Sequence, residues 1–231
     1  MSDAPLLIAA ATPAELAPLD AALAGAREVP GGRAGTLEGR AAVLVATGVG
    51  KAAAAAGVAR HVERHAPAAV LHVGIAGAYV GAFVPVGVTV AAASEVDLDL
   101  GVASFVNDGG ARVEAMEDVD FALPGATPLP TDAAWRDALA RAAGVPPEPF
   151  ATSDAASGDL DVAAARAARS GAAVESMEGV AVAVACAAAG VPFAEVRGIA
   201  NVAGVRDKAQ WEIAAAVRGV AATVRDALRR T

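Results

Sequence analysis

The stretch from 174 to 207 constrains the fold more than any other part of the chain. It reads as a short acidic turn, a helix that begins at Met177, a reversal, a strand over 193–199 and an irregular loop. Gly190 and Pro192 mark the end of the helix, because glycine accepts a left-handed C′ position and proline cannot continue a helix. A helix followed directly by a buried strand is the repeating unit of an α/β sheet.

Other apolar runs repeat this alternation along the chain. Predicted strands cover 6–11, 42–46, 69–75 and 86–92, with short ones at 150–153 and 172–175; predicted helices cover 12–23, 51–65, 132–143, 160–170 and 210–230. Loops and short strands are expected between 94 and 130. The pattern predicts an α/β fold, with one domain over 1–231 and three α/β/α layers around a central, mainly parallel mixed sheet.

Composition narrows the class of protein and its partners. Hydrophobic residues make up 55% of the chain and aromatic ones only 3%, so we expect close helix–sheet packing of alanine and valine. The net charge of −8 argues against nucleic acid or an anionic membrane as partner, since both require a basic face. No apolar run reaches the roughly 18 residues of a membrane span, and no basic leader precedes the first strand. A lone cysteine, Cys186, fits a reducing compartment, so we expect a soluble cytoplasmic protein.

Three polar residues stand where an open α/β sheet binds ligands, at the carboxyl ends of its strands. Glu15 follows the first strand, Glu178 falls in the first turn of the predicted helix, and Asn201 lies just past a strand end. A structural role is open for both carboxylates. Glu15 completes a capping box with Thr12, and a glutamate in a first helical turn gains from the helix dipole.

Two glycine-containing turns also follow predicted strands. Residues 47–51 end in Gly-Val-Gly-Lys but lack the spacer of a P-loop, and Ala52 stands where serine or threonine would hold magnesium. A plain tight turn and a turn whose amides hold an oxyanion are both open. Residues 74–77 suggest a glycine-lined floor under a ligand. Histidines, cysteine and carboxylates show no metal-ligand spacing, so neither a metal nor a cofactor is expected.

Together these pieces resemble the nucleoside phosphorylase/nucleosidase superfamily over nearly the whole chain. The resemblance rests on the turn ending at Glu15, on 47–51 and 74–77, and above all on Val-Glu-Ser-Met-Glu-Gly at 174–179 followed by Arg-Gly-Ile-Ala-Asn at 197–201. It implies a nucleoside phosphorylase-like fold, with Glu15 activating water. By the same resemblance Met177 and Glu178 hold the ribose, and the other substrate contacts include Gly48, Ala76 and Gly77.

Within the superfamily the chain is most similar to the futalosine hydrolases, in its Glu-x-Met-Glu-Gly pattern, in 190–201 and in the tail 206–211. This similarity implies hydrolysis of the N-ribosidic bond of futalosine with release of hypoxanthine, in the futalosine route to menaquinone. The methylthioadenosine/adenosylhomocysteine nucleosidases carry aspartate where this chain has Asn201. Aspartate suits a 6-aminopurine, whereas the asparagine NH₂ donates to O6 of a 6-oxopurine and its carbonyl accepts from N7–H. Hypoxanthine is a 6-oxopurine.

Some substrate contacts and several functions stay open. Phe105 or Phe150 could stack on the base or simply pack in the core, and Trp211 could close over the site with Asp207 and Arg206. A purine nucleoside phosphorylase would need cations for phosphate, such as Arg33 lent by a neighbouring subunit. A methylthioadenosine/adenosylhomocysteine nucleosidase and a non-catalytic nucleoside-binding module are also open. In each case the partner is a small purine nucleoside, and a homo-oligomer, dimer or higher, is expected.

Overall fold

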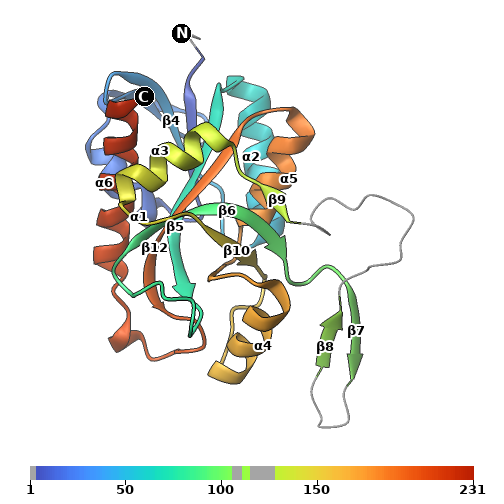
Figure 1. Cartoon of the computed structure of the whole chain (residues 1–231). Coiled ribbons are helices and arrows are strands. Elements are labelled where there is room, and N and C mark those ends of the chain that lie inside the picture. The colour runs from blue at the N-terminus through green and yellow to red at the C-terminus, as the bar shows by residue number, and fades with distance from the viewer. Residues whose placement is uncertain (1–3, 106–110, 115–127) are drawn as a thin grey trace.

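A ten-stranded sheet forms the centre of the computed structural model, in the order β11-β10-β6-β12-β5-β1-β4-β3-β2, with β9 paired to β6 (Figure 1). The structure describes residues 4–105, 111–114 and 128–231, with the backbone alone for 102–105 and 111–114. The elements are β1 (Leu6–Ala10), α1 (Pro13–Ala21), β2 (Ala24–Val29), β3 (Gly32–Leu37), β4 (Arg40–Ala46), α2 (Lys51–His65), β5 (Ala69–Ala78), β6 (Thr89–Asp97), β7 (Val102–Phe105), β8 (Ala111–Glu114), β9 (Leu129–Pro130), α3 (Ala133–Ala143), β10 (Glu148–Thr152), α4 (Leu160–Ser170), β11 (Val174–Ser176), α5 (Gly179–Ala189), β12 (Phe193–Val202), the short 3₁₀ helix η1 (Lys208–Gln210) and α6 (Ile213–Arg230).

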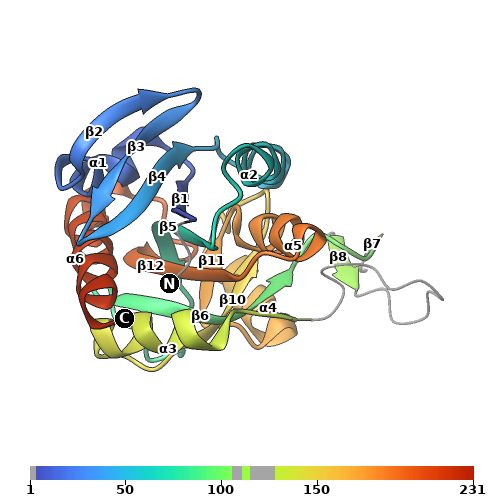
Figure 2. The same cartoon turned by 90° about the horizontal axis from the view of Figure 1, so that it is seen from above.

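Helices cover both faces of the sheet, as predicted. Alternation along β1 sends Ile8 toward the face covered by α1, α3 and α6, and Leu7 toward the face covered by α2 and α5 (Figure 2). The packing on both faces is mainly alanine, valine and leucine, which agrees with the low aromatic content. None of the helices in the described part of the chain is long and apolar enough to cross a membrane.

The sheet contains more antiparallel pairing than the sequence predicts. Residues 24–37, for which the sequence predicted no strand, form the hairpin β2–β3 beside β4, and Arg33 lies in β3. Strand β6 runs antiparallel to β12, and β11 pairs antiparallel with β5. The second pairing closes β5, β12, β6, β10 and β11 into a ring. The fold is therefore α/β with a mixed sheet whose centre, β4-β1-β5-β12, is parallel.

Three predicted boundaries next to the expected site are shifted. Helix α5 begins at Gly179 and not at Met177, which leaves Glu178 in the N-cap position with φ −132°. Strand β12 continues to Val202 because it stays paired with β5, so Asn201 lies inside the strand, beyond a register shift. Helix α6 begins at Ile213 and not at 210, because η1 precedes it.

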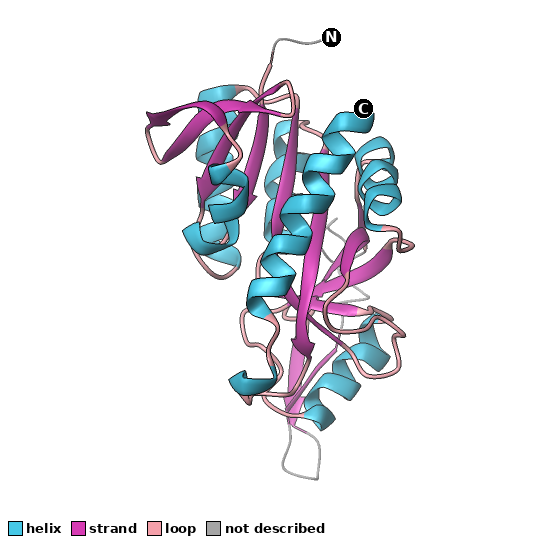
Figure 3. Cartoon of the chain, turned by 90° about the vertical axis from the view of Figure 1, so that its left-hand side faces the viewer, coloured by secondary structure: helices cyan, strands magenta, loops and turns pink. Residues whose placement is uncertain are grey.

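The parallel centre fixes where a site can form. Strands β1, β4, β5 and β12 run in the same direction, so the segments that follow them gather at one edge of the sheet. Helix α6, which faces the viewer in Figure 3, lies along the sheet and starts at this edge, just after η1.

Candidate active site

A pocket of about 380 Å³ opens at the carboxyl edge of the parallel strands. Its walls come from the carboxyl-terminal parts of β5, β11 and β12, from the segments that follow β1, β4, β10, β11 and β12, and from the start of α6. Among the residues that line it are Thr12, Glu15, Val49, Ile75, Ala76, Gly77, Ser157, Glu175, Met177, Glu178, Asn201, Arg206, Lys208, Trp211, Ile213 and Val217. The pocket thus brings together most of the residues that the sequence singled out, from segments as far apart as α1 and α6.

Glu15 is both a capping residue and a wall of the pocket. The predicted capping box is present: Thr12 donates to Glu15 Oε2 from its backbone nitrogen at 2.9 Å and from its hydroxyl at 2.8 Å. The other carboxylate oxygen, Oε1, accepts from the Ile75 amide at 3.1 Å. Gly74 makes this approach possible, because a Cβ there would stand 2.7 Å from Glu15 Oε1. The carboxylate is therefore fixed at the ends of both β1 and β5.

Glu178 accepts hydrogen bonds from the turn after β4 and from a buried arginine. Its Oε1 accepts from the Gly50 amide at 3.2 Å, and its Oε2 accepts from Arg197 Nη2 at 3.3 Å. The next amide of the same turn, that of Lys51, donates to Asp154 at 2.7 Å. The P-loop-like turn thus uses these two amides to hold carboxylates of the protein. Glu178 lines the pocket, and a hydrogen bond to each of its two carboxylate oxygens orients it.

Arg197 supports both carboxylates, although the sequence assigned it no role. The guanidinium is buried and donates to Glu195 at 2.6 Å, to Glu178 at 3.3 Å and to the Ile75 carbonyl at 3.3 Å. Burial disfavours the charged guanidinium, but the charges of Glu195, Glu178 and Glu15 outweigh burial and raise the pKa of Arg197. The charged guanidinium beneath the pocket holds the Glu178 carboxylate by an ion pair and interacts with the charge of Glu15.

Asn201 offers hydrogen-bonding groups to the pocket. It is only 8% exposed, and one Nδ2 hydrogen is donated to the Val202 carbonyl at 2.8 Å. The carbonyl oxygen and the second amide hydrogen are left for a ligand. One acceptor and one donor side by side match the N7–H and O6 of a 6-oxopurine.

Glu175 also lines the pocket, but the protein uses its carboxylate fully. Oε1 accepts from the Ser157 amide at 2.7 Å, and Oε2 accepts from the Ser157 hydroxyl, from Tyr79 at 2.9 Å and from Arg166 at 3.1 Å. Glu175 and Glu178 therefore both reach this edge of the sheet. The bonding still separates the two glutamates, because Glu175 accepts four hydrogen bonds from the protein and Glu178 accepts two.

Four residues predicted to contact the substrate lie elsewhere or outside the described side chains. Phe150 is fully buried in the core with Val90 and Ile199, so of its two predicted roles the structure shows packing and not stacking. Gly48 does not line the pocket, although Val49 does. Asp207 caps η1 through the Ala209 amide and is not part of the wall. Phe105 belongs to β7, and its side chain is outside the described part.

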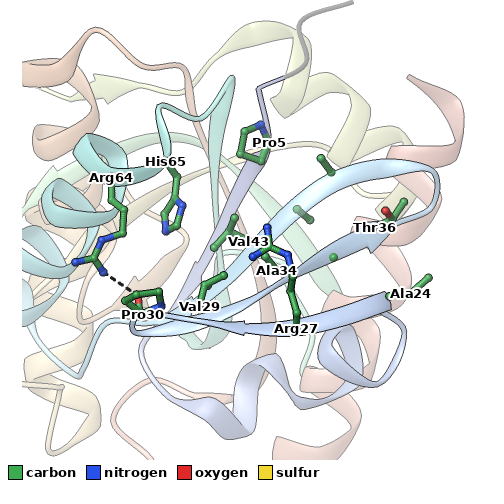
Figure 4. A pocket seen from close by; sticks show the side chains of 14 residues that line it. Pro5, Ala24, Arg27, Val29, Pro30, Ala34, Thr36, Val43, Arg64 and His65 are labelled. Carbon is green, nitrogen blue, oxygen red and sulfur yellow. Dashed lines mark hydrogen bonds between the residues drawn. The ribbon is translucent and has the colours of Figure 1, made fainter.

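A second hollow lies at the opposite, amino edge of the sheet. It is larger, about 650 Å³, and is lined by Pro5, Arg27, Thr36, Arg64 and His65 between the hairpin β2–β3 and the end of α2 (Figure 4). It contains no carboxylate and none of the motif residues. Within the described residues, no group of histidine, cysteine and carboxylate side chains could hold a metal ion.

Comparison with known proteins agrees with this arrangement. The profile of the phosphorylase superfamily matches residues 5–230. The futalosine hydrolase of Thermus thermophilus is 36% identical over 82% of this chain and 82% of its own length. The futalosine hydrolase of Streptomyces coelicolor is 36% identical over 75% of this chain and 73% of its own length.

Solved structures share the fold at lower identity. A methylthioadenosine/adenosylhomocysteine nucleosidase from Streptococcus pyogenes superposes with a TM-score of 0.83 at 24% identity, covering 100% of this chain and 98% of that one. The futalosine hydrolase of Helicobacter pylori superposes with a TM-score of 0.82 at 16% identity, covering 99% of this chain and 98% of that one. The superfamily profile and the two curated relatives show that the chain belongs to the phosphorylase superfamily and, within it, to the futalosine hydrolase family.

Proposed function

We propose that the protein hydrolyses the N-ribosidic bond of futalosine and releases hypoxanthine and dehypoxanthine futalosine, in menaquinone biosynthesis by the futalosine route. The observation that carries this proposal is the grouping of Glu15, Glu178 and Asn201 around one pocket, in a chain whose curated relatives are futalosine hydrolases. Asparagine at 201 favours a 6-oxopurine such as hypoxanthine over a 6-aminopurine.

Glu15, Glu178 and Asn201 each have one proposed role in the reaction. The C1′–N9 bond breaks, its electron pair leaves with the base, and the ribose acquires oxocarbenium character. Asn201 donates to O6 of the departing purine, and its carbonyl accepts from N7–H once a proton from solvent has added to N7 of the leaving base. Glu178, held by Gly50 and Arg197, presents an anion to the ribose hydroxyls and stabilises the positive sugar. Met177 packs beside the ribose.

Glu15 is the proposed general base. Water supplies the oxygen that bonds to C1′, and Glu15 takes the proton that this water loses. Thr12 donates two hydrogen bonds to this carboxylate and Ile75 donates one, and these bonds hold it in the pocket wall, where it can take the proton as the water attacks. The bonds from Thr12 cap the helix, whereas the bond from the Ile75 amide holds the other carboxylate oxygen against β5.

A phosphorylase would need cations that bind phosphate near these carboxylates, and three of the candidates, Arg33, Arg197 and Lys51, are already paired with carboxylates of the protein. Arg33 is held in β3 by Asp20 at 2.7 Å and Glu28 at 3.3 Å. Arg197 and Lys51 are paired with carboxylates as well. A non-catalytic binding module would bind a nucleoside without forming any product, and a methylthioadenosine/adenosylhomocysteine nucleosidase would prefer a 6-amino base.

Product analysis with and without phosphate distinguishes these functions. The expected result is release of hypoxanthine from futalosine at a rate independent of phosphate, with a free sugar as the second product. A rate that rises in proportion to phosphate, together with a sugar 1-phosphate, would replace hydrolysis by phosphorolysis. Release of no base from a panel of purine nucleosides would support the binding module instead.

The protein is further proposed to be cytoplasmic and to form a homo-oligomer, dimer or higher. Exposed apolar side chains support the second proposal: Phe83 is 99% exposed and Val80 is 70% exposed, on the segment after β5. Leu160 and Val162, at the start of α4, are also exposed. Sedimentation velocity tests this proposal, and a mass equal to that of one chain would contradict it.

A further inference from the structure

Two cations that line the pocket, Arg206 and Lys208, lack the carboxylate partners that the neighbouring cations have within the described part of the chain. Lys51 is paired with Asp97 and Asp99, Arg166 with Glu175, and Arg197 with Glu178 and Glu195. Arg206 and Lys208 also line the pocket, but no carboxylate in the described part of the chain lies within ion-pair distance of either. In a chain of net charge −8, two unpaired cations at one pocket are the groups most able to attract an anion.

The single acidic residue between them does not neutralise them. Asp207 turns its carboxylate to the Ala209 amide at 3.0 Å and to the Gln210 side chain at 3.1 Å. These hydrogen bonds lower the pKa of Asp207 and fix the loop as a cap of η1. Arg206 and Lys208, on either side of Asp207, both reach the wall of the pocket.

Arg206 is also held in place. Its guanidinium carbon lies 5.1 Å from the centre of the Trp211 ring, and the Trp211 indole nitrogen donates to the Val205 carbonyl at 3.0 Å. Stacking of this kind leaves the N–H groups at the edge of the guanidinium available. A planar fork of donors held against an aromatic wall suits a carboxylate, which it can bind through two parallel hydrogen bonds.

The same pocket also has an apolar lining. It includes Trp211, Ile213, Val217 and Val49, of which Ile213 and Val49 are 42% and 55% exposed. An apolar lining together with two cations fits an extended ligand group with an apolar body and an anion at its far end.

We propose that Arg206 and Lys208 form a subsite for a carboxylate on the 5′ substituent of the nucleoside, with Trp211, Ile213 and Val49 contacting the apolar part of that substituent. This inference rests on the proposed function, because futalosine carries an aryl carboxylate in this position. Arg206 binds the carboxylate by paired hydrogen bonds, and Lys208 adds a second charge. The subsite selects carboxylated nucleosides over inosine, which has the same base and ribose.

The test compares futalosine with its methyl ester, which keeps the aryl group but not the charge. For the wild type we expect kcat/KM to be about 10- to 100-fold higher for the acid than for the ester, mainly through KM, because a hydrogen bond to a charged group is lost. In Arg206→Ala the acid should lose at least about tenfold more than the ester. Arg206→Lys should recover part of the loss, since charge returns without the fork. Arg218→Ala, on the exposed surface of α6, is the matched control.

Each outcome decides one proposal. If the wild type hydrolyses acid and ester equally well, or if Arg206→Ala reduces both to the same extent, the carboxylate subsite is wrong and Arg206 acts only through Trp211. If the wild type releases no hypoxanthine from either compound, the proposed function itself is wrong. A KM for the acid that rises with salt while that for the ester stays constant would support the subsite independently.

Discussion

At the scale of single residues, one substitution tests the proposed recognition of the purine by Asn201. In Asn201→Asp an ionised carboxylate faces O6 of hypoxanthine, and two acceptors meet with no proton between them. An unsatisfied partner in a desolvated site costs about 1–3 kcal/mol, and more when a charge is involved. The variant should lose kcat/KM on futalosine and gain relative preference for the 6-amino analogue, by about tenfold or more in the ratio.

The measurement is kcat/KM for futalosine and for its 6-amino counterpart, with both proteins. The burial of Asn201 makes a check of folding necessary, so Tm accompanies each value. A folded variant with an unchanged ratio would show that Asn201 does not read the base.

Glu15 and Glu178 give a second prediction at this scale. Both Glu15→Gln and Glu178→Gln should remain folded and lose about 10²- to 10⁴-fold in kcat, as expected for removal of a general base or of a charge beside the sugar. For Glu15 a structural explanation competes, because glutamine can also complete a capping box.

Thr12→Ala separates capping from catalysis. It removes the side-chain cap of α1 but keeps the Glu15 carboxylate, so it should cost about 0.5–2 kcal/mol of stability and far less turnover than Glu15→Gln. Equal losses of turnover in the two variants, or a normal kcat in Glu15→Gln, would leave Glu15 as a cap only.

At the scale of elements, the contact between β12 and α6 holds the pocket together. A Cβ on Gly198 would stand 2.4 Å from the Ala216 carbonyl oxygen, so only glycine lets the helix lie this close to the strand. Gly198→Ala should push α6 outward, cost about 1–3 kcal/mol or more, and raise KM, since α6 begins with the pocket residue Ile213. Gly158→Ala is the control, because a Cβ there meets nothing within 4 Å. Equal Tm and KM in both variants would contradict this role of Gly198.

Elements with a strong local signal could be predicted from the sequence, and those that depend on distant pairing could not. The capping box of α1 and the whole of α4 match the prediction, because Thr12, Asp159 and Gly171 mark their ends locally. The hairpin β2–β3 could not be foreseen because its first strand is largely exposed and consists of small and polar residues, with no apolar alternation. The hairpin forms because β3 pairs with β4, a strand that lies outside residues 24–37.

The same distinction applies to the site. Glu15, Glu178 and Asn201 stand in motifs beside helix and strand ends, so their common edge could be foreseen. The buried charged residues that hold these side chains in place could not be foreseen, because Arg197 contacts His72, which belongs to another strand. One signal was present: Glu195 and Arg197 are two charges on the same face of a buried strand, where charged residues require partners.

At the scale of the whole molecule, a buried group of charges makes stability depend on pH. Glu95 and Glu195 are both fully buried beside Arg197. Burial and the neighbouring charge of Glu195 raise the pKa of Glu95 well above 4.5. Burial also acts to raise the pKa of Glu195, but Arg197 and His72 lower it to about 2. Glu95 therefore keeps its proton, which can bridge Glu95 Oε1 and Glu195 Oε2; both oxygens are buried without a hydrogen-bond partner, and Glu195 Oε2 also lies 3.3 Å from His72 Nδ1.

Glu95→Gln tests this protonation state. In the wild type the unfolded chain loses the Glu95 proton above pH 4.5 while the folded protein retains it, so the free energy of unfolding falls as pH rises, by up to about 1.4 kcal/mol per pH unit. The pKa of Glu195 is lowered, so its contribution is present above pH 4.5 and is lost only as pH falls toward about 2, outside this window. Glutamine accepts from Thr152 and donates to Glu195 as protonated Glu95 does, but it does not titrate.

The Tm of the variant should therefore match the wild type near pH 5 and exceed it increasingly toward pH 8, in scanning calorimetry over about pH 5 to 8. Glu63→Gln, at an exposed position on α2, is the control and should give a constant difference. A constant difference for Glu95→Gln as well would mean that Glu95 is ionised in the folded protein. Arg197 would then be shared among more carboxylates, and Glu178 would lose part of the cation that orients it.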